Sequence, residues 1–212
     1  MTLSLLFPIL ILMACSITAV PYGDRWIETL YQMYPELLSN PAANTMLKRH
    51  RRQLLRILLC LCVIKVTIFS SQPLPAPLSL IAAFFLLLIT CTDFEQQVIF
   101  DKMLLPFALF APIAWLWLPL PYTDYLLAAF AGGICFLLFA FLTHGGIGGG
   151  DIKLIFVLGL WLGPHLLLQT ICIGLLFGGA AALILLLTKR KTAHSYFAYG
   201  PYFAISALFY LL

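Results

Sequence analysis

Long apolar segments alternate with short polar turns along almost the whole chain. A helix needs about 20 apolar residues to span a bilayer, and tilted or buried helices manage with fewer. Prolines cluster at Pro73–Pro77, and Gly163-Pro164 interrupts the apolar stretch that follows residue 151, as expected of turns. We therefore predict an all-α polytopic membrane protein with about eight transmembrane helices, at residues 3–20, 53–71, 78–92, 103–119, 124–143, 152–163, 165–187 and 195–212.

The composition excludes a water-soluble protein. Hydrophobic residues make up 63% of the 212 residues, charged residues only 9%, and the mean hydropathy is +1.03. No soluble fold of this length hides so much apolar surface. Residues 1–212 are therefore expected to form a single integral membrane domain, and the longest polar stretch, 21–52, is expected to be a cytoplasmic loop within it.

Within this predicted loop, apolar and aromatic residues recur at rough helical spacing, among them Trp26, Leu30 and Tyr34. The spacing is typical of an amphipathic helix that lies on the membrane surface. A solvated connector fits the same residues equally well, so both interpretations stay open.

The positive charges predict how the chain is oriented. They gather in turns that alternate with turns free of Lys and Arg, such as Pro119–Thr123. The positive-inside rule then places the N-terminus outside and the basic turns in the cytoplasm. Because the net charge of +4 is spread in short blocks beside apolar segments, nucleic acid is not expected as a partner. The basic turns contain Lys48–Arg56, Lys102, Lys153 and Lys189–Lys191.

Two acids stand at the ends of apolar segments, and both are predicted to emerge at the cytoplasmic face. Asp93 ends the run 78–92, and Asp151 follows the glycine-rich run 145–150. An ionisable group at membrane depth is costly and points to function. One reading is a catalytic carboxylate pair. The alternative is a small transporter that uses Asp93 and Asp151 for cation or proton coupling, although transport sites lie nearer the bilayer midplane.

A carboxylate pair hydrolyses peptides when one member is ionised and the other is protonated. The chain lacks Gly-x-Ser-x-Gly, His-Glu-x-x-His and any Cys/His ligand set. We therefore expect peptide cleavage that needs no metal and no cofactor. The glycines Gly148, Gly149 and Gly150 let backbone approach backbone, so they are predicted to admit an extended substrate strand beside Asp151.

The glycine run also carries a family resemblance. Gly148–Asp151 matches the Gly-x-Gly-Asp signature of membrane aspartyl proteases, and Gly148–Leu154 followed by Leu158–Gly163 resembles the corresponding segment of type IV prepilin peptidases.

Two further segments resemble the same family. Thr92–Glu95 with Asp101–Pro106 is similar to its other catalytic segment, although Phe100 stands where the family usually has proline. Tyr199–Ala204 is similar to its C-terminal Phe-Gly-Pro-Phe motif.

The resemblance implies a catalytic pair at Asp93 and Asp151, with Asp101 as a non-catalytic acid. It implies cleavage of the basic leader from type IV prepilins or pseudopilins, at the cytoplasmic face of the bacterial inner membrane, for type IV pili, type II secretion or competence. Many members then methylate the new N-terminus with S-adenosylmethionine. Residues 21–52 lack the four-cysteine zinc-binding element of larger members, so we expect a minimal peptidase, for which methyl transfer is unsupported.

Two charged residues beside the acids are candidates for substrate contact. Glu95 is placed to hold a basic leader, or is a solvated loop acid. Lys153 is placed to pair with an acid on the substrate or on the enzyme itself, or to anchor to lipid headgroups.

Overall fold

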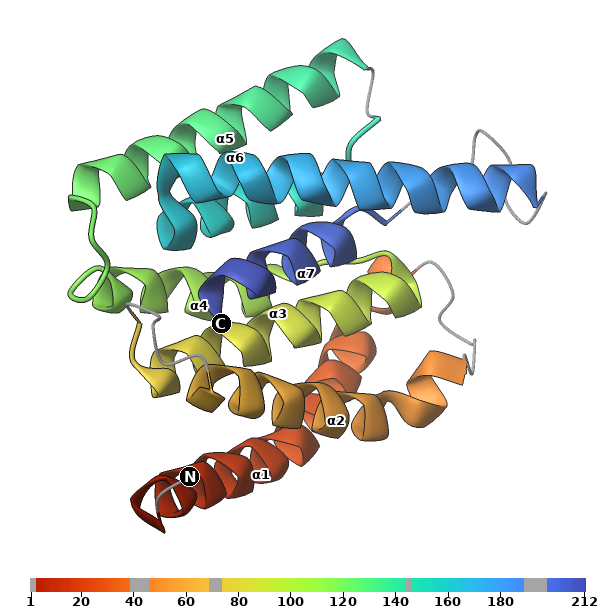
Figure 1. The fold of residues 1–212 in the computed structure, drawn as a ribbon. Helices are drawn as coiled ribbons and strands as arrows, with labels where there is room; N and C mark the ends of the chain where they lie inside the picture. The colour runs from red at the N-terminus through yellow and green to blue at the C-terminus, as the bar shows by residue number, and fades with distance from the viewer. Residues whose placement is uncertain (1–2, 39–45, 69–73, 144–145, 189–197) are drawn as a thin grey trace.

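The computed structural model describes residues 3–38, 46–68, 74–143, 146–188 and 198–212, and within these ranges every regular element is helical. Three of the described helices, α3, α5 and α6, are long and apolar enough to cross a membrane. The predicted all-α membrane protein is confirmed. The elements, drawn in Figure 1, are α1 Leu3–Met33, the 3-10 helix η1 Pro35–Leu37, α2 Met46–Ile68, α3 Ala76–Gln96, α4 Asp101–Ala114, α5 Tyr122–Leu142, α6 Gly149–Leu187 and α7 Gly200–Leu211.

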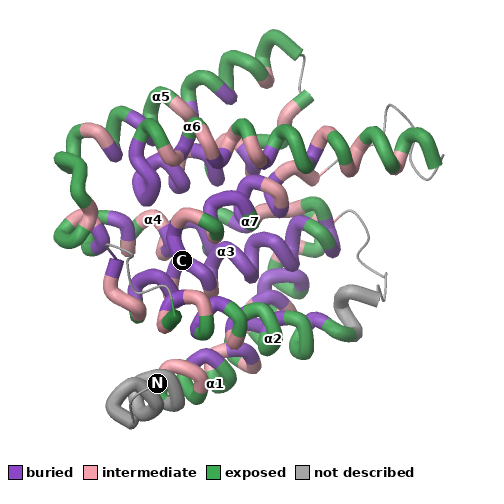
Figure 2. The backbone as a smooth tube through the Cα atoms, in the orientation of Figure 1, coloured by how far each residue is buried: buried purple, intermediate pink, exposed green. Residues whose placement is uncertain are grey.

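Helix α3 forms the centre of the bundle. Most of its side chains are buried, and it packs against α2, α4, α7 and α1. Figure 2 shows α3 largely buried, whereas α5 and the far end of α6 are largely exposed. Their exposed side chains are apolar, as with Phe141 and Leu187, which suits a lipid environment. A carboxylate carried by α3 is therefore surrounded largely by protein.

Helix α6 reverses direction at Gly163, where the sequence predicts a break. Gly163 has φ 69 and ψ −179, and Pro164 follows it. A Cβ placed on Gly132 of α5 would lie 3.2 Å from Ile155 Cγ2 and 2.9 Å from Leu167 Cδ2. A straight helix would separate those two residues by about 18 Å. The chain therefore doubles back, as Figure 1 shows, and the predicted break at Gly163-Pro164 is confirmed.

Residues 21–33 are not a loop. Helix α1 continues through them to Met33, and its 31 residues extend for about 46 Å, which exceeds the hydrocarbon core of about 30 Å. The helical spacing of these residues is confirmed, but the apolar face of the helix packs on protein instead of on the membrane surface. A Cβ on Gly23 would lie 2.9 Å from Leu88 Cδ2, and the Trp26 and Phe85 rings are 6.1 Å apart. Within 21–52, residues 46–52 are also helical.

Candidate active site

Asp93 lies in the last turn of α3 and is only 4% exposed. The helix ends because Gln97 adopts the left-handed conformation, with φ 55, and donates its backbone N–H to the carbonyl of Asp93 at 2.9 Å. A left-handed residue commonly ends a helix in this way, although it is most often glycine. The Asp93 carboxyl is thus placed at the end of a buried helix, beside the turn that leads into α4.

Asp151 lies in the first turn of α6 and is 7% exposed. Gly148 precedes the helix in an extended conformation, with φ −67 and ψ 142, and accepts a hydrogen bond from the Asp151 backbone N–H at 3.1 Å. The last two glycines of the run, Gly149 and Gly150, therefore belong to the first turn of the helix, and this turn also carries the acid.

The two acids meet at Gly200, the first residue of α7. A Cβ placed on Gly200 would lie 2.5 Å from Asp93 Oδ2 and 3.1 Å from Asp151 Oδ1. Both carboxyl groups therefore approach the same point of the α7 backbone, and no side chain fits there. Three helix ends from distant parts of the chain build the pair.

A cavity of about 480 Å³ opens beside the pair. It is lined by both carboxyl groups, by the three glycines before Asp151 and by the turn between α3 and α4. Leu37 of η1 and Tyr34, the residue before η1, complete the wall. The described cavity thus brings together Asp93, Asp151, Gly148, Gly149, Gly150 and Lys153 from the predicted site.

The three predicted glycines have different surroundings. A Cβ on Gly150 would lie 3.0 Å from Ile99 Cβ, whereas a Cβ on Gly149 would meet nothing within 4 Å. A Cβ on Gly148 would lie 3.5 Å from Asp151 Oδ2, which is ordinary contact. Close packing against the α3–α4 turn therefore requires glycine at position 150 only, and Gly149 leaves open space beside the acids.

Lys153 pairs with an acid of the protein itself. Its Nζ lies 2.8 Å from Oδ1 and 2.7 Å from Oδ2 of Asp101, in the first turn of α4. Both side chains are more than half exposed and line the cavity. An exposed pair of this kind adds little stability. It ties the start of α4 to the start of α6 at the rim of the site.

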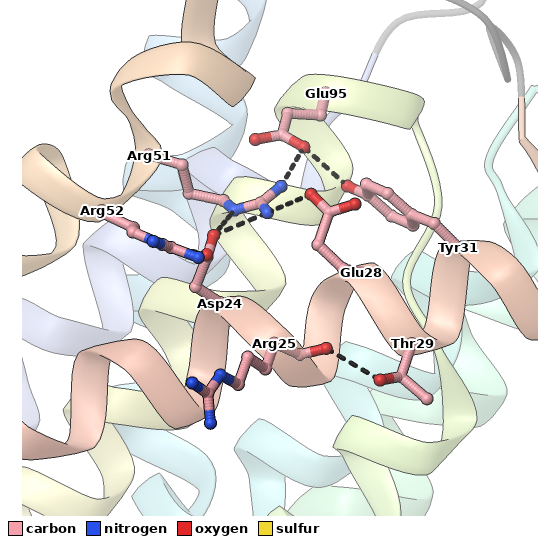
Figure 3. Close-up of polar contacts among 8 residues, drawn as sticks. All are labelled: Asp24, Arg25, Glu28, Thr29, Tyr31, Arg51, Arg52 and Glu95. Atoms are coloured by element: carbon pink, nitrogen blue, oxygen red, sulfur yellow. Dashed lines mark hydrogen bonds and ion pairs between the residues drawn. The ribbon is translucent and has the colours of Figure 1, made fainter.

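Glu95 is not a solvated loop acid, and that expectation is wrong. It is 6% exposed and accepts hydrogen bonds from Arg51 Nη1 at 2.8 Å and from the Tyr31 hydroxyl at 2.9 Å. Figure 3 shows its carboxyl pointing toward these two side chains. It does not belong to the residues that line the described cavity. The carboxyl is therefore committed to the protein interior and does not face a substrate there.

Phe100 replaces the expected proline without loss of the turn. It precedes α4 in an extended conformation, with φ −81 and ψ 130, and is 3% exposed. Its ring centroid lies 6.0 Å from that of Tyr31 and 6.2 Å from that of Tyr34. Aromatic packing thus holds the α3–α4 turn.

Gly200 is a residue of the site that the sequence alone does not predict. The signal that could have found it is the Tyr199–Ala204 motif, which contains this glycine. Among the described residues, no group of three or more His, Cys, Asp or Glu side chains is arranged to hold a metal ion.

Part of the chain is similar to known proteins. A sequence profile of the type IV leader peptidase family matches residues 80–183. The chain is 39% identical over 111 residues to the prepilin leader peptidase/N-methyltransferase of Bacillus subtilis (strain 168). The aligned segment covers 50% of this chain and 45% of that protein. It is 30% identical over 129 residues to the protein of the same name from Pseudomonas putida, and this segment covers 57% of this chain and 44% of that protein. It is 32% identical over 139 residues to the protein of the same name from Neisseria gonorrhoeae, and this segment covers 60% of this chain and 45% of that protein.

Each of these matches spans less than half the length of the relative. No solved structure matches the chain. Asp93 and Asp151 lie inside the matched residues 80–183, whereas Gly200 and Arg51 lie outside them. The transporter alternative receives no support from these comparisons.

Proposed function

Because the chain belongs, through residues 80–183, to the type IV leader peptidase family, we propose that it is an aspartic endopeptidase that removes the basic leader of type IV prepilins or pseudopilins. The relatives named prepilin leader peptidase/N-methyltransferase support leader cleavage as the reaction. The observation that carries the proposal is the approach of two buried carboxyl groups, Asp93 and Asp151, to the single backbone position Gly200 beside an open cavity.

Two carboxyl groups that share one buried site do not both ionise, so the pair holds one proton between its members. The ionised carboxylate takes a proton from a water molecule, whose oxygen attacks the scissile carbonyl carbon. The protonated carboxyl donates a hydrogen bond to the carbonyl oxygen, where negative charge develops. The C–N bond then breaks as the first carboxyl returns its proton to the leaving amine. No metal or cofactor takes part in these steps.

The substrate strand is proposed to lie in the cavity along the open side of Gly149, where a Cβ would meet nothing within 4 Å. An extended substrate needs free space beside the carboxyl pair. Its scissile carbonyl carbon must come within about 3–3.5 Å of the attacking oxygen. The exposed rim at Asp101 and Lys153 is the side from which the peptide would enter.

We propose that the chain spans the bacterial inner membrane with about eight helices, with the N-terminus outside and the acids at the cytoplasmic face. Support comes from the one-sided placement of Lys and Arg and from the reversal at Gly163, which divides α6 into two antiparallel segments. Reporter fusions after residues 98 and 146 are expected to give cytoplasmic signals. A periplasmic signal at either position would contradict this orientation.

The function is tested by incubating the purified protein in detergent with a prepilin and then sequencing and weighing the product. We expect a new N-terminus immediately after the basic leader. An uncleaved prepilin in the presence of folded enzyme would exclude the function. The proposal assigns no residue to methyl transfer with S-adenosylmethionine, and the product mass shows whether a methyl group has been added.

A further inference from the structure

A buried charge cluster lies on the other side of α3 from the carboxyl pair. Arg51 is 1% exposed, and its guanidinium contacts three acids: Asp24 Oδ1 at 2.7 Å from Nε, Glu95 Oε2 at 2.8 Å from Nη1 and Glu28 Oε1 at 2.6 Å from Nη2. Tyr31 donates its hydroxyl to the same Glu95 oxygen. Figure 3 shows these five side chains converging, and we call them the Arg51 cluster.

The charges of the cluster are held in place by one another. Burial raises the pKa of Asp24, but the hydrogen bonds from Arg52 and Arg51 outweigh it and the net shift of the pKa is downward. The Asp24 carboxyl is therefore ionised at neutral pH. A buried ionic cluster costs so much desolvation that apolar side chains of similar volume would stabilise a fold equally well. Its value lies in fixing geometry, since a planar guanidinium binds its acids in set directions.

The cluster connects three helices, and Glu95 is its sole member on α3. Asp24, Glu28 and Tyr31 come from α1, and Arg51 comes from α2. Glu95 lies two residues after Asp93, which places the two side chains about 200° apart around the helix. The last turn of α3 is thus held on one face by Arg51, while its other face presents Asp93 to Gly200.

The last turn of a helix is the part that opens most readily, because its final carbonyls lack partners within the helix. The reacting carboxyl of Asp93 lies in this turn, four residues before Gln97, where the chain leaves the helix. We propose that Arg51 and Glu95 are positioning residues for Asp93, which lock the end of α3 so that the two carboxyl groups meet. This inference rests on the proposed peptidase function.

Two matched substitutions separate positioning from general stability. Glu95→Gln and Glu28→Gln each remove one negative charge from Arg51 and leave the side-chain shape unchanged. Glu95 lies on α3 and accepts a hydrogen bond from Arg51 Nη1, whereas Glu28 lies on α1 and accepts one from Arg51 Nη2. The Glu28→Gln variant is therefore the control, because in it Arg51 keeps Asp24 as a partner and Glu95 keeps its hydrogen bonds from Arg51 and Tyr31.

The first measurement is hydrogen–deuterium exchange of the resting protein, with no substrate present. We expect faster exchange at residues 93–97 in Glu95→Gln, and exchange like that of the unmodified protein in Glu28→Gln. The second is cleavage of a prepilin, for which we expect kcat of Glu95→Gln to fall by about tenfold to a hundredfold with KM nearly unchanged, because a displacement of about 1 Å has this effect.

Unchanged exchange at residues 93–97 in Glu95→Gln overturns the inference, and so does an equal loss of kcat in both variants. If the unmodified protein does not cleave prepilin at all, the peptidase function fails, and the exchange measurement alone still decides whether the cluster holds the end of α3. Should Glu95→Gln fail to accumulate, Tyr31→Phe removes a single hydroxyl from Glu95. It is expected to change exchange and kcat in the same direction by a smaller factor.

Discussion

Replacing Gly200 by alanine should separate the two acids that meet there. The added Cβ would lie 2.5 Å from Asp93 Oδ2, 2.8 Å from Ile99 Cδ1 and 3.1 Å from Asp151 Oδ1. Carbon and oxygen atoms in contact lie about 3.3 Å apart or more, so the Asp93 carboxyl has to move by roughly 1 Å. A misplacement of about 1 Å costs about a hundredfold in rate, which corresponds to roughly 2.7 kcal/mol of transition-state stabilisation.

Backbone strain is not part of this effect, because φ at Gly200 is not positive. Among the described glycines, only Gly163 has a positive φ. Overpacking of this kind costs about 1–3 kcal/mol of stability, and thermal unfolding in detergent measures that cost separately. The matched control is Gly179→Ala on α6, where a Cβ would meet nothing within 4 Å.

The assay compares initial rates of prepilin cleavage by the two variants and the unmodified protein at equal concentrations of folded enzyme. We expect Gly200→Ala to lose about a hundredfold and Gly179→Ala to keep its rate. A Gly200→Ala enzyme that cleaves as fast as the control would refute the reasoning, because the carboxyl groups would then react without meeting at this backbone position.

Three further outcomes are expected from the same assay. Asp93→Asn and Asp151→Asn should each abolish cleavage with membrane insertion intact, whereas Asp101→Asn, which removes only an exposed ion pair at the rim, should keep much of the activity; the opposite ranking would shift the catalytic role to Asp101. Gly150→Ala should slow cleavage more than Gly149→Ala, since only the former places a Cβ 3.0 Å from Ile99, and equal rates would remove the packing role of the glycine. A metal chelator should leave the rate unchanged because two carboxyl groups supply both acid and base; a loss that added zinc restores would contradict this.

The membrane class of the protein and the break at Gly163-Pro164 could be predicted without tertiary structure. Both depend on local properties, namely the apolar content of a segment and the backbone torsions that glycine and proline allow. Local signals also marked Asp93 and Asp151 as candidate functional residues, because a carboxyl group at the end of an apolar helix is costly wherever that helix packs. The choice of catalysis over transport came from the family resemblance. Helical spacing within 21–33 was visible for the same reason.

The contacts that buried side chains make could not be predicted from the sequence, because they depend on which helix ends meet in space. Glu95 follows Asp93 by only two residues, and hydropathy places both at a helix end, yet one faces the cavity and the other faces Arg51. The apolar face of residues 21–33 suited a lipid surface as well as it suits α3, and only packing chose α3. Gly200 acquires its role because α3, α6 and α7 bring two carboxyl groups to its backbone. Such contacts arise from long-range packing, which the pattern along one chain does not specify, whereas the cost of placing each segment in lipid or water is set residue by residue.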